Sequence, residues 1–312
     1  MESHVVTPLA PKRRALVTGG AGFIGSHVCE ALLADGCEVY VLDNLSTGSV
    51  NNIAHLMHRG DFHLVVGSVL EQDTVTELAA KCDVIYHLAA QVDVRRSVAE
   101  PAFDAQVNVA GTAAVLEAAR QASARVVLAS TAAVYGDPEQ VPLRETAAIA
   151  PLSPYGGGKY AAEVYLETFG RLYGVSTVAL RMANVYGPRQ DPHGEAGVIS
   201  IFCGAAAEGR TATIFGDGLQ TRDYVYVGDV AAAWAAAGRS TVTGALNVST
   251  GIETNLLEVA AHLGLPCRHA PARDGEIARS CLDPSAAAAA LGWAATTSLQ
   301  DGLRSTMTAA AA

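Results

Sequence analysis

The stretch TGGAGFIG, residues 18–25, decides how the first part of the chain folds. It follows a short apolar run and opens a segment with helical periodicity. Its glycines have separate purposes: Gly19 permits a tight turn, Gly22 lets the backbone approach a pyrophosphate, and Gly25 allows helix and strand to pack closely. The N-terminus of the helix then offers free N–H groups and the positive end of a dipole. The stretch therefore predicts a strand, a turn and a helix that bind a dinucleotide.

Outside this stretch, short apolar runs alternate with helical patterns. Runs rich in Val, Leu and Ile indicate buried strands at 15–17, 38–42, 63–66, 84–86, 125–128 and 176–182. Helical patterns lie between them, at 23–34, 73–80 and 107–121. Strands that alternate with helices imply a parallel sheet with right-handed crossovers. We therefore predict an α/β fold built on a doubly wound parallel sheet of the Rossmann type.

The alternation stops in the second half of the chain, where residues 186–194 form a turn-rich loop. Further helices are expected at 198–208 and 229–237. We expect residues 1–184 to form a dinucleotide-binding domain. Residues 185–312 should form mainly a smaller lobe that closes over the carboxyl edge of the sheet, with room for the chain to cross back to the first domain.

Composition narrows the class of protein. The chain has 312 residues, half of them hydrophobic, so a sizeable core is expected. A net charge of -10 argues against a general nucleic-acid binder, because phosphate backbones attract basic surfaces. The first 14 residues contain no apolar targeting segment and no run of 18 apolar residues follows, so we expect a soluble cytoplasmic protein without membrane contact.

Cysteine and histidine spacing predicts no metal site. The six cysteines form no C-x-x-C pair and are expected to be small buried apolar residues. His55 and His58 lie three residues apart, but no third ligand is nearby, so surface histidines are expected.

Asp43 ends the second expected strand, 18 residues after Gly25. A carboxylate there can accept hydrogen bonds from an adenosine ribose and would repel a 2′-phosphate. The alternative is a solvated loop acid. The position favours NAD over NADP.

Tyr155 and Lys159 lie four residues apart and share one face of a helix. An ammonium beside a phenol should lower the tyrosine pKa from about 10 towards neutrality, which produces a general base. Such a pair arises often by chance and could be a surface Tyr and Lys, but it opens the helix after the fifth strand. Thr131 ends that strand, where ligands bind in open α/β sheets; its hydroxyl could bind the reacting oxygen or serve only the turn.

Eight stretches in one order carry a resemblance that spans nearly the whole chain. They are TGGAGFIGSH (18–27), LDNLSTG (42–48), HLAAQVDVRRSV (87–98), STAAVYG (130–136), SPYGGGK (153–159), RMANVYGPRQDPHGEAGV (181–198), TIFGDGLQTRDYVYVGDV (213–230) and LDPSAAAAALGW (282–293). The chain resembles the extended short-chain dehydrogenase/reductase (NAD-dependent epimerase/dehydratase) family, and within it the UDP-glucose 4-epimerase group. The resemblance implies NAD as cofactor, a UDP-sugar as substrate, and a homodimer formed partly through the helix with Tyr155.

The resemblance also assigns roles to residues. Tyr155 is the acid/base, Lys159 tunes it and holds the nicotinamide ribose, and Thr131 binds the sugar O4. The implied cofactor-binding residues are Gly19, Gly22, Phe23, Ile24, Gly25, Asp43, Asn44, Ser46, Thr47, Gly48, Ser68, Val69, Leu88, Ala89, Ala90, Gln91, Asn108, Ser130, Tyr155 and Lys159. The implied substrate-binding residues are Thr131, Tyr155, Asn184, Arg189, Val198, Thr213, Phe215, Arg222, Arg273 and Ser280, with Asn184, Arg222 and Arg273 on the diphosphate and Thr213 and Phe215 at the uracil.

Ala132 and Ala133 bear on the reaction. Dehydrating relatives carry an Asp/Glu pair here, so the alanines favour C4 epimerisation through a 4-keto sugar. A nucleotide-sugar dehydratase or reductase and a non-catalytic NAD-binding sensor remain as alternatives. UDP-glucose/UDP-galactose is the first choice of substrate. A small Ser280 could instead admit an N-acetyl group, and Arg189 or Arg96 could meet the carboxylate of UDP-glucuronate.

The chain departs from the family pattern at two places. Residues 156–158 are all glycine, where a Ser commonly precedes the Lys, so the catalytic helix starts loosely or needs close packing. Ser68 replaces the usual Asp after the third strand, which puts an adenine contact in doubt.

Overall fold

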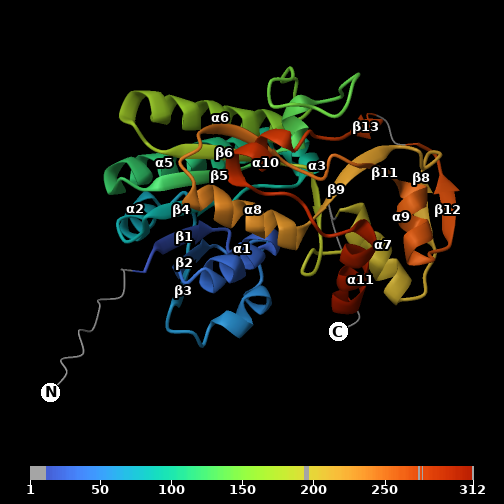
Figure 1. Ribbon diagram of the computed structural model, residues 1–312, viewed down its shortest axis with the longest axis horizontal. Helices are drawn as coiled ribbons and strands as arrows, with labels where there is room; N and C mark the ends of the chain where they lie inside the picture. Colours follow the sequence, from blue (N-terminus) through green and yellow to red (C-terminus); the bar gives the residue numbers. More distant parts are fainter. Residues whose placement is uncertain (1–11, 193–196, 273–274, 276, 311–312) are drawn as a thin grey trace.

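The computed structural model describes residues 12–192, 197–272, 275 and 277–310. Its centre is a seven-stranded parallel sheet in the order β10-β6-β5-β4-β1-β2-β3 (Figure 1). The strands are β1 (Arg14–Thr18), β2 (Glu38–Asp43), β3 (Phe62–Val66), β4 (Val84–His87), β5 (Arg125–Thr131), β6 (Thr177–Met182) and β10 (Gly244–Val248). The strand order reverses between β1 and β4, which opens a crevice at the carboxyl edge. The predicted doubly wound Rossmann fold is confirmed.

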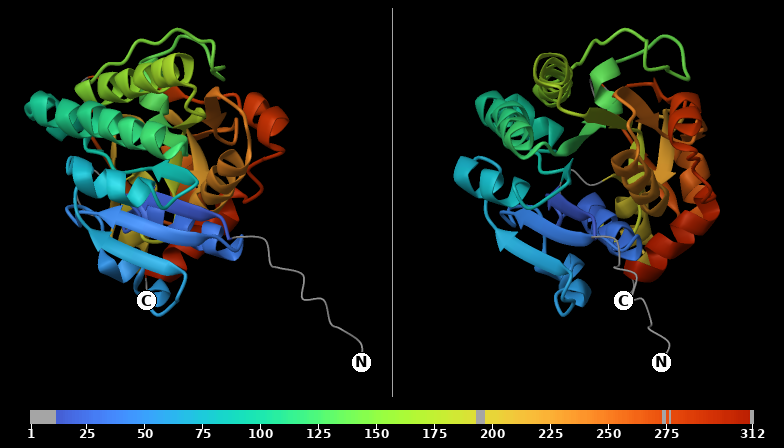
Figure 2. Two further views of the ribbon diagram at one scale, coloured as in Figure 1. Left: turned by 90° about the vertical axis from the view of Figure 1, so that its left-hand side faces the viewer. Right: turned by 60° about the vertical axis from the view of Figure 1, so that its left-hand side comes forward.

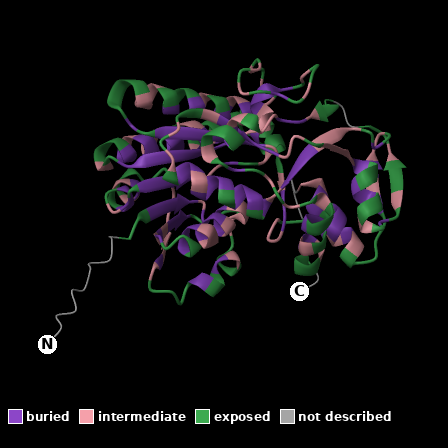
Figure 3. Cartoon of the chain, in the orientation of Figure 1, coloured by how far each residue is buried: buried purple, intermediate pink, exposed green. Residues whose placement is uncertain are grey.

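Helices cover both faces of this sheet (Figure 2). One face packs against α1 (Phe23–Ala34), α8 (Val227–Arg239) and α10 (Ser285–Leu291). The other packs against α2 (Gln72–Ala79), α5 (Gly111–Ala122) and α6 (Pro154–Tyr173). Because both faces are covered, the central strands are buried along their whole length, as in β6 and β4 (Figure 3). Five cysteines are buried and Cys267 is half-buried; all six are free thiols.

One helix differs from its expected limits. The segment expected to form a helix over 107–121 begins instead with the π turn η3 (Gln106–Ala110), and α5 follows at Gly111. Two short helices, α3 (Val94–Ala99) and α4 (Pro101–Ala105), lead into it. The π turn adds a residue and places the Asn108 side chain towards the loop after β4, where its hydrogen bonds compensate for the irregular backbone.

A smaller lobe follows in the second half of the chain and lies beside the carboxyl edge of the large sheet (Figure 1). One of its sheets contains β7 (Asn184–Tyr186), β9 (Thr221–Tyr226), β11 (Glu253–Asn255) and β13 (Arg279–Ser280); the other pairs β8 (Ala212–Phe215) with β12 (Cys267–Ala270). Helices α7 (Val198–Ala207), α9 (Leu256–Leu263) and α11 (Leu299–Ala310) enclose its own apolar core.

The chain crosses back to the large sheet between these elements. Strand β10 pairs with β6 in register from Gly244 with Val178 to Val248 with Met182, and α8 packs against α1. The division at residue 184 stays a prediction, but α8, β10 and α10 all come from the segment assigned mainly to the lobe. Within the described ranges, no helix has the length and apolar character needed to cross a membrane.

Candidate active site

The glycine turn after β1 depends on space that only glycine leaves. Gly19 has φ 73°, and a Cβ there would lie 2.7 Å from the Ala89 backbone nitrogen. A Cβ on Gly25 would lie 2.1 Å from the Gly19 carbonyl oxygen, so helix and turn pack backbone to backbone. Helix α1 then starts at Phe23, and its N-cap Gly22 has no side chain to accept from the first amides. These features fit the pyrophosphate of a dinucleotide.

Asp43 connects this turn to the end of β2. Its carboxylate is only 6% exposed; Oδ2 accepts from the Ala21 N–H at 2.9 Å and Oδ1 from the Leu45 N–H at 2.8 Å. The alternative of a solvated loop acid is therefore wrong. A carboxylate accepts about four hydrogen bonds, so Asp43 retains capacity for ribose hydroxyls. The implied residues Asn44, Ser46, Thr47 and Gly48 follow in the loop after β2, and a Cβ on Gly48 would lie 3.0 Å from both Asp43 carboxylate oxygens.

His87 forms hydrogen bonds beside the glycine turn, a role that the sequence analysis did not predict. Its Nδ1 lies 2.7 Å from Thr18 Oγ1 and its Nε2 lies 3.2 Å from Thr112 Oγ1. Thr18 Oγ1 in turn accepts from the Ala89 N–H, so this chain fixes the half-buried stretch 88–90 beside the glycine turn. Burial, with a smaller contribution from the Lys159 charge, lowers the His87 pKa to about 3. The position of His87 at the end of an apolar strand was the sequence feature that could have indicated this role.

The structure brings Thr131, Tyr155 and Lys159 together at the carboxyl end of β5. Ser153 caps α6 by accepting from the Gly156 N–H at 3.2 Å, which places Tyr155 in the first turn. The Thr131 hydroxyl lies close enough to the Tyr155 phenol to influence its pKa, and Lys159 lies one turn further along, buried. Tyr155 and Thr131 line a cavity of about 230 Å³.

The pKa values of Tyr155 and Lys159 differ from those expected from their spacing. Burial raises the Tyr155 pKa to about 12, although the hydrogen bond with Thr131 acts in the opposite direction. Burial also lowers the Lys159 pKa to about 8, while the negative charge of Asp104 raises it. The expectation that the lysine brings the phenol towards neutrality is therefore wrong for the protein alone, because loss of water is the largest effect on the pKa of each group.

The far wall of the cavity comes from the smaller lobe. Asn184 from β7, Arg222 from β9, Ser280 from β13 and Ile277 line it there, whereas Val94 of α3 lines it from the large domain. Three other implied substrate residues lie elsewhere in the lobe: Val198 starts α7, and Thr213 and Phe215 lie on β8. Arg273 lies outside the described residues.

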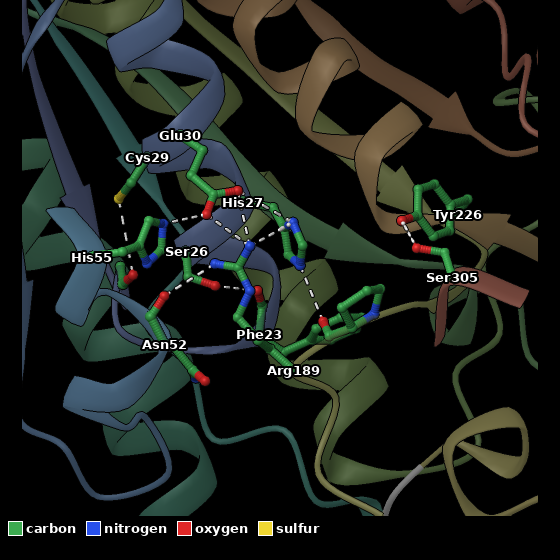
Figure 4. A network of polar contacts seen from close by, with 12 residues as sticks. Phe23, Ser26, His27, Cys29, Glu30, Asn52, His55, Arg189, Tyr226 and Ser305 are labelled. Carbon is green, nitrogen blue, oxygen red and sulfur yellow. Dashed lines mark hydrogen bonds and ion pairs between the residues drawn. The ribbon is translucent and has the colours of Figure 1, made fainter. Parts of the chain in front are cut away.

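Arg189 does not reach this cavity. Its guanidinium donates to both oxygens of Glu30 at 2.8 Å and to the Asn52 carbonyl at 3.0 Å (Figure 4). It also lies 3.2 Å from His27 Nδ1. The assignment to substrate binding is thus not supported, since the nearby carboxylate on α1 satisfies the guanidinium.

Several implied cofactor residues have other roles. Ser130 is 2% exposed and donates to Glu163, which pairs with Arg181 at 2.7 Å, so it does not face the crevice. Val69 is 5% exposed and belongs to the core beneath α5. Gln91 is buried, with its side chain bonded to protein atoms on both ends. The side chains of these residues are engaged within the protein, and their assignment to the cofactor stays a prediction. Ser68 lies half-buried at the end of β3.

The three glycines before Lys159 are explained by packing at two of the positions. A Cβ on Gly156 would lie 2.7 Å from the Ala133 carbonyl oxygen, and one on Gly158 would lie 2.9 Å from Asp104 Oδ2. A Cβ on Gly157 would meet no atom within 4 Å. The helix therefore does not start loosely. Among the described residues, no cluster of three or more His, Cys, Asp or Glu side chains could hold a metal ion.

The sheet order and the glycine turn define a Rossmann-type nucleotide-binding protein. The model of the NAD-dependent epimerase/dehydratase family matches residues 15–249. The chain belongs to this family.

Known epimerases are similar to this chain along nearly its whole length. A UDP-glucose 4-epimerase of Mycolicibacterium smegmatis is 46% identical over 304 residues, which cover 94% of this chain and 97% of the relative. The structure of UDP-glucose 4-epimerase with UDP-glucose from Thermotoga maritima has a TM-score of 0.88 and 39% identity, covering 95% of this chain and 98% of that one. The Thermus thermophilus UDP-glucose 4-epimerase complex with NAD has a TM-score of 0.86 and 42% identity, with the same coverage.

Proposed function

We propose that this protein is an NAD-dependent enzyme that inverts the C4 hydroxyl of a UDP-hexose, with UDP-glucose and UDP-galactose as first-choice substrates. The observation that carries the proposal is that Thr131 and Tyr155 line one cavity, with buried Lys159 one turn away on the same helix. A phenol next to a threonine hydroxyl, with a lysine one turn away on the same helix, is suited to taking a proton from a sugar alcohol. A non-catalytic NAD sensor would not need all three groups.

Each residue of the site has its own role in the proposed reaction. Thr131 orients O4 of the sugar, and Tyr155 removes its proton and later returns it. Lys159 supplies positive charge near the developing phenolate and holds the nicotinamide ribose. NAD bound at the glycine turn would reversibly accept hydride from C4. Asn184 and Arg222 bind the diphosphate, so that the 4-keto hexose can turn over without leaving the cavity.

The cavity favours an uncharged hexose over a hexuronate. Arg189 is bonded to Glu30, and Arg96 lies 4.3 Å above the Phe103 ring and pairs with Glu100. Both arginines suggested for a C6 carboxylate are therefore engaged elsewhere. Ala132 and Ala133 line the cavity, and its described lining contains no carboxylate that could assist a dehydration.

We also propose a cytoplasmic homodimer that associates partly through α6. Its outer face exposes large apolar side chains, among them Val164, Tyr165 and Leu172. A patch of this kind on one helix is typical of a subunit interface. Sedimentation velocity that detects only monomer would refute the dimer. The six free thiols agree with a reducing compartment.

The proposed activity predicts loss of turnover in Tyr155→Phe with NAD binding retained. Removal of the phenolic oxygen eliminates the proton acceptor, so kcat should fall by about 10²–10⁴-fold. UDP-glucose, UDP-N-acetylglucosamine and UDP-glucuronate are incubated separately, and the C4 configuration is followed by NMR. Tyr160→Phe is the matched control, because Tyr160 lies on the exposed side of the same helix. Full turnover by Tyr155→Phe would exclude the assignment.

A further inference from the structure

The helix with Tyr155 and Lys159 packs against a buried acid that the proposed mechanism does not use. Asp104 lies in α4 and is 1% exposed, and Lys159 is 5% exposed. The two helices contact each other directly. A buried carboxylate costs free energy unless hydrogen bonds and an opposite charge compensate it.

Hydrogen bonds hold this carboxylate in one orientation. Its Oδ1 accepts from Gln91 Nε2 and from Asn108 Nδ2, both at 3.0 Å. Asn108 also exchanges hydrogen bonds with the Gln91 backbone, accepting from its N–H at 3.0 Å and donating to its carbonyl at 2.9 Å. Two amide donors on one oxygen fix the position of the Asp104 carboxylate.

The second oxygen of Asp104 contacts the turn that precedes Lys159. A Cβ on Gly158 would lie 2.9 Å from this oxygen, so a larger residue there would have to displace the carboxylate. The absence of a side chain at Gly158, one of the departures from the family pattern, leaves room for this carboxylate against the catalytic helix.

Other charged groups near Lys159 cannot replace Asp104. Tyr155 is neutral when protonated, and His87 stays neutral because burial lowers its pKa to about 3. Glu163, one turn after Lys159, is paired with Arg181 at 2.7 Å. The remaining titratable groups on elements packed against α6 are Arg95, Arg96, Glu117, Arg120, Arg125 and Tyr135.

We propose that Asp104 is a positioning residue that keeps Lys159 in its ammonium form, through a buried carboxylate held against α6 by Gln91 and Asn108. The role rests on the proposed function, since a charged Lys159 matters because it assists Tyr155. The field of Asp104 opposes the effect of burial on the Lys159 pKa, which is about 8. The same field raises the pKa of Tyr155, so Asp104 keeps both protons on the pair until substrate arrives.

Lysine NMR tests the proposal without relying on activity. The chain contains only three lysines, Lys12, Lys81 and Lys159, so carbon-13 labelling at Cε gives three signals. Asp104→Asn keeps the shape and the Oδ1 acceptor but removes the charge. We expect the Lys159 midpoint to fall by about one pH unit in the full-length protein. Lys12 and Lys81 are exposed and serve as internal references.

Glu100→Gln is the matched control. It removes one negative charge four residues before Asp104, but from a side chain that is 52% exposed, where water screens its field. The Lys159 midpoint should not move. An unchanged midpoint in folded Asp104→Asn would overturn the proposal. Should that variant not fold, Gly158→Ala displaces the carboxylate and should lower the midpoint by a smaller amount, whereas Gly157→Ala should not; equal midpoints would count against the proposal.

Activity measurements separate this inference from the proposed function. Turnover of UDP-sugar by Asp104→Asn should have its pH profile shifted to lower pH, with the affinity for NAD retained. If the wild type epimerises no UDP-sugar while the lysine midpoint still moves, the proposed function fails and the electrostatic role of Asp104 stands. If the wild type is active and neither the midpoint nor the profile moves, only the role of Asp104 fails.

Discussion

Single residues in this protein obtain their chemistry from burial rather than from sequence spacing. The Tyr155–Lys159 pair satisfies the expected spacing, yet burial moves both pKa values towards the neutral forms. Lys159 therefore lies close to its midpoint at physiological pH. A modest change of local charge is then enough to change the protonation state of Lys159, so the charge of Asp104 can affect it.

His87 gives a residue-scale prediction for stability at acid pH. Its folded pKa is about 3 against an unfolded value of 6.5, so only the unfolded chain takes up the proton between these values. The contribution to stability is complete above pH 6.5 and is lost as the pH falls towards 3, by roughly 2–3 kcal/mol at pH 4.5. Urea unfolding at several pH values should give a smaller pH slope for His87→Gln than for wild type. Equal slopes would show that His87 is not neutral in the folded protein.

At the scale of elements, the start of α6 depends on close packing at alternate glycines. Gly156 faces the Ala133 carbonyl oxygen, which cannot move without disturbing the cavity wall. Gly157 faces open space. Close packing therefore favours glycine at positions 156 and 158, whereas Gly157 adds conformational freedom to the unfolded chain without a packing reason.

Two alanine substitutions separate these cases. Gly157→Ala should raise the free energy of unfolding by about 0.5–1 kcal/mol, because alanine loses less backbone freedom on folding. Gly156→Ala should lower it by about 1–3 kcal/mol, since its Cβ would lie 2.7 Å from a backbone oxygen. Chemical denaturation of both variants checks the contrast. Two variants that change stability in the same direction would contradict the packing argument.

At the scale of the whole molecule, Arg189 joins the loop after β7 to α1, far away in sequence (Figure 4). His27 Nε2 donates to the Pro188 carbonyl at 3.0 Å, which leaves Nδ1 to accept from Arg189, and burial keeps the histidine pKa below its usual value. Arg189 has φ 70°, a strained conformation that these contacts maintain. The entry to the smaller lobe is thereby fixed to the large domain.

A double-mutant cycle measures this connection. Arg189→Met and Glu30→Gln should each destabilise the protein, with a coupling free energy of about 0.5–1.5 kcal/mol, because one guanidinium nitrogen contacts both carboxylate oxygens but the pair is partly exposed and screened by solvent. Urea unfolding of the four proteins gives the coupling. Turnover of UDP-glucose at saturating substrate should remain within a few-fold for Arg189→Met. Strictly additive effects would mean that the contact is not energetically significant.

The sequence alone determined the Rossmann sheet, the glycine turn and the positions of Thr131, Tyr155 and Lys159, because these depend on local periodicity and on short spacings along one strand or helix. Tertiary structure decided which polar groups meet. It returned β10 to the large sheet, bound Arg189 to Glu30, turned Ser130 towards Glu163 and placed Asp104 against Gly158. Each of these contacts joins residues distant in sequence, and the protonation of Tyr155 and Lys159 depends on how completely such contacts exclude water.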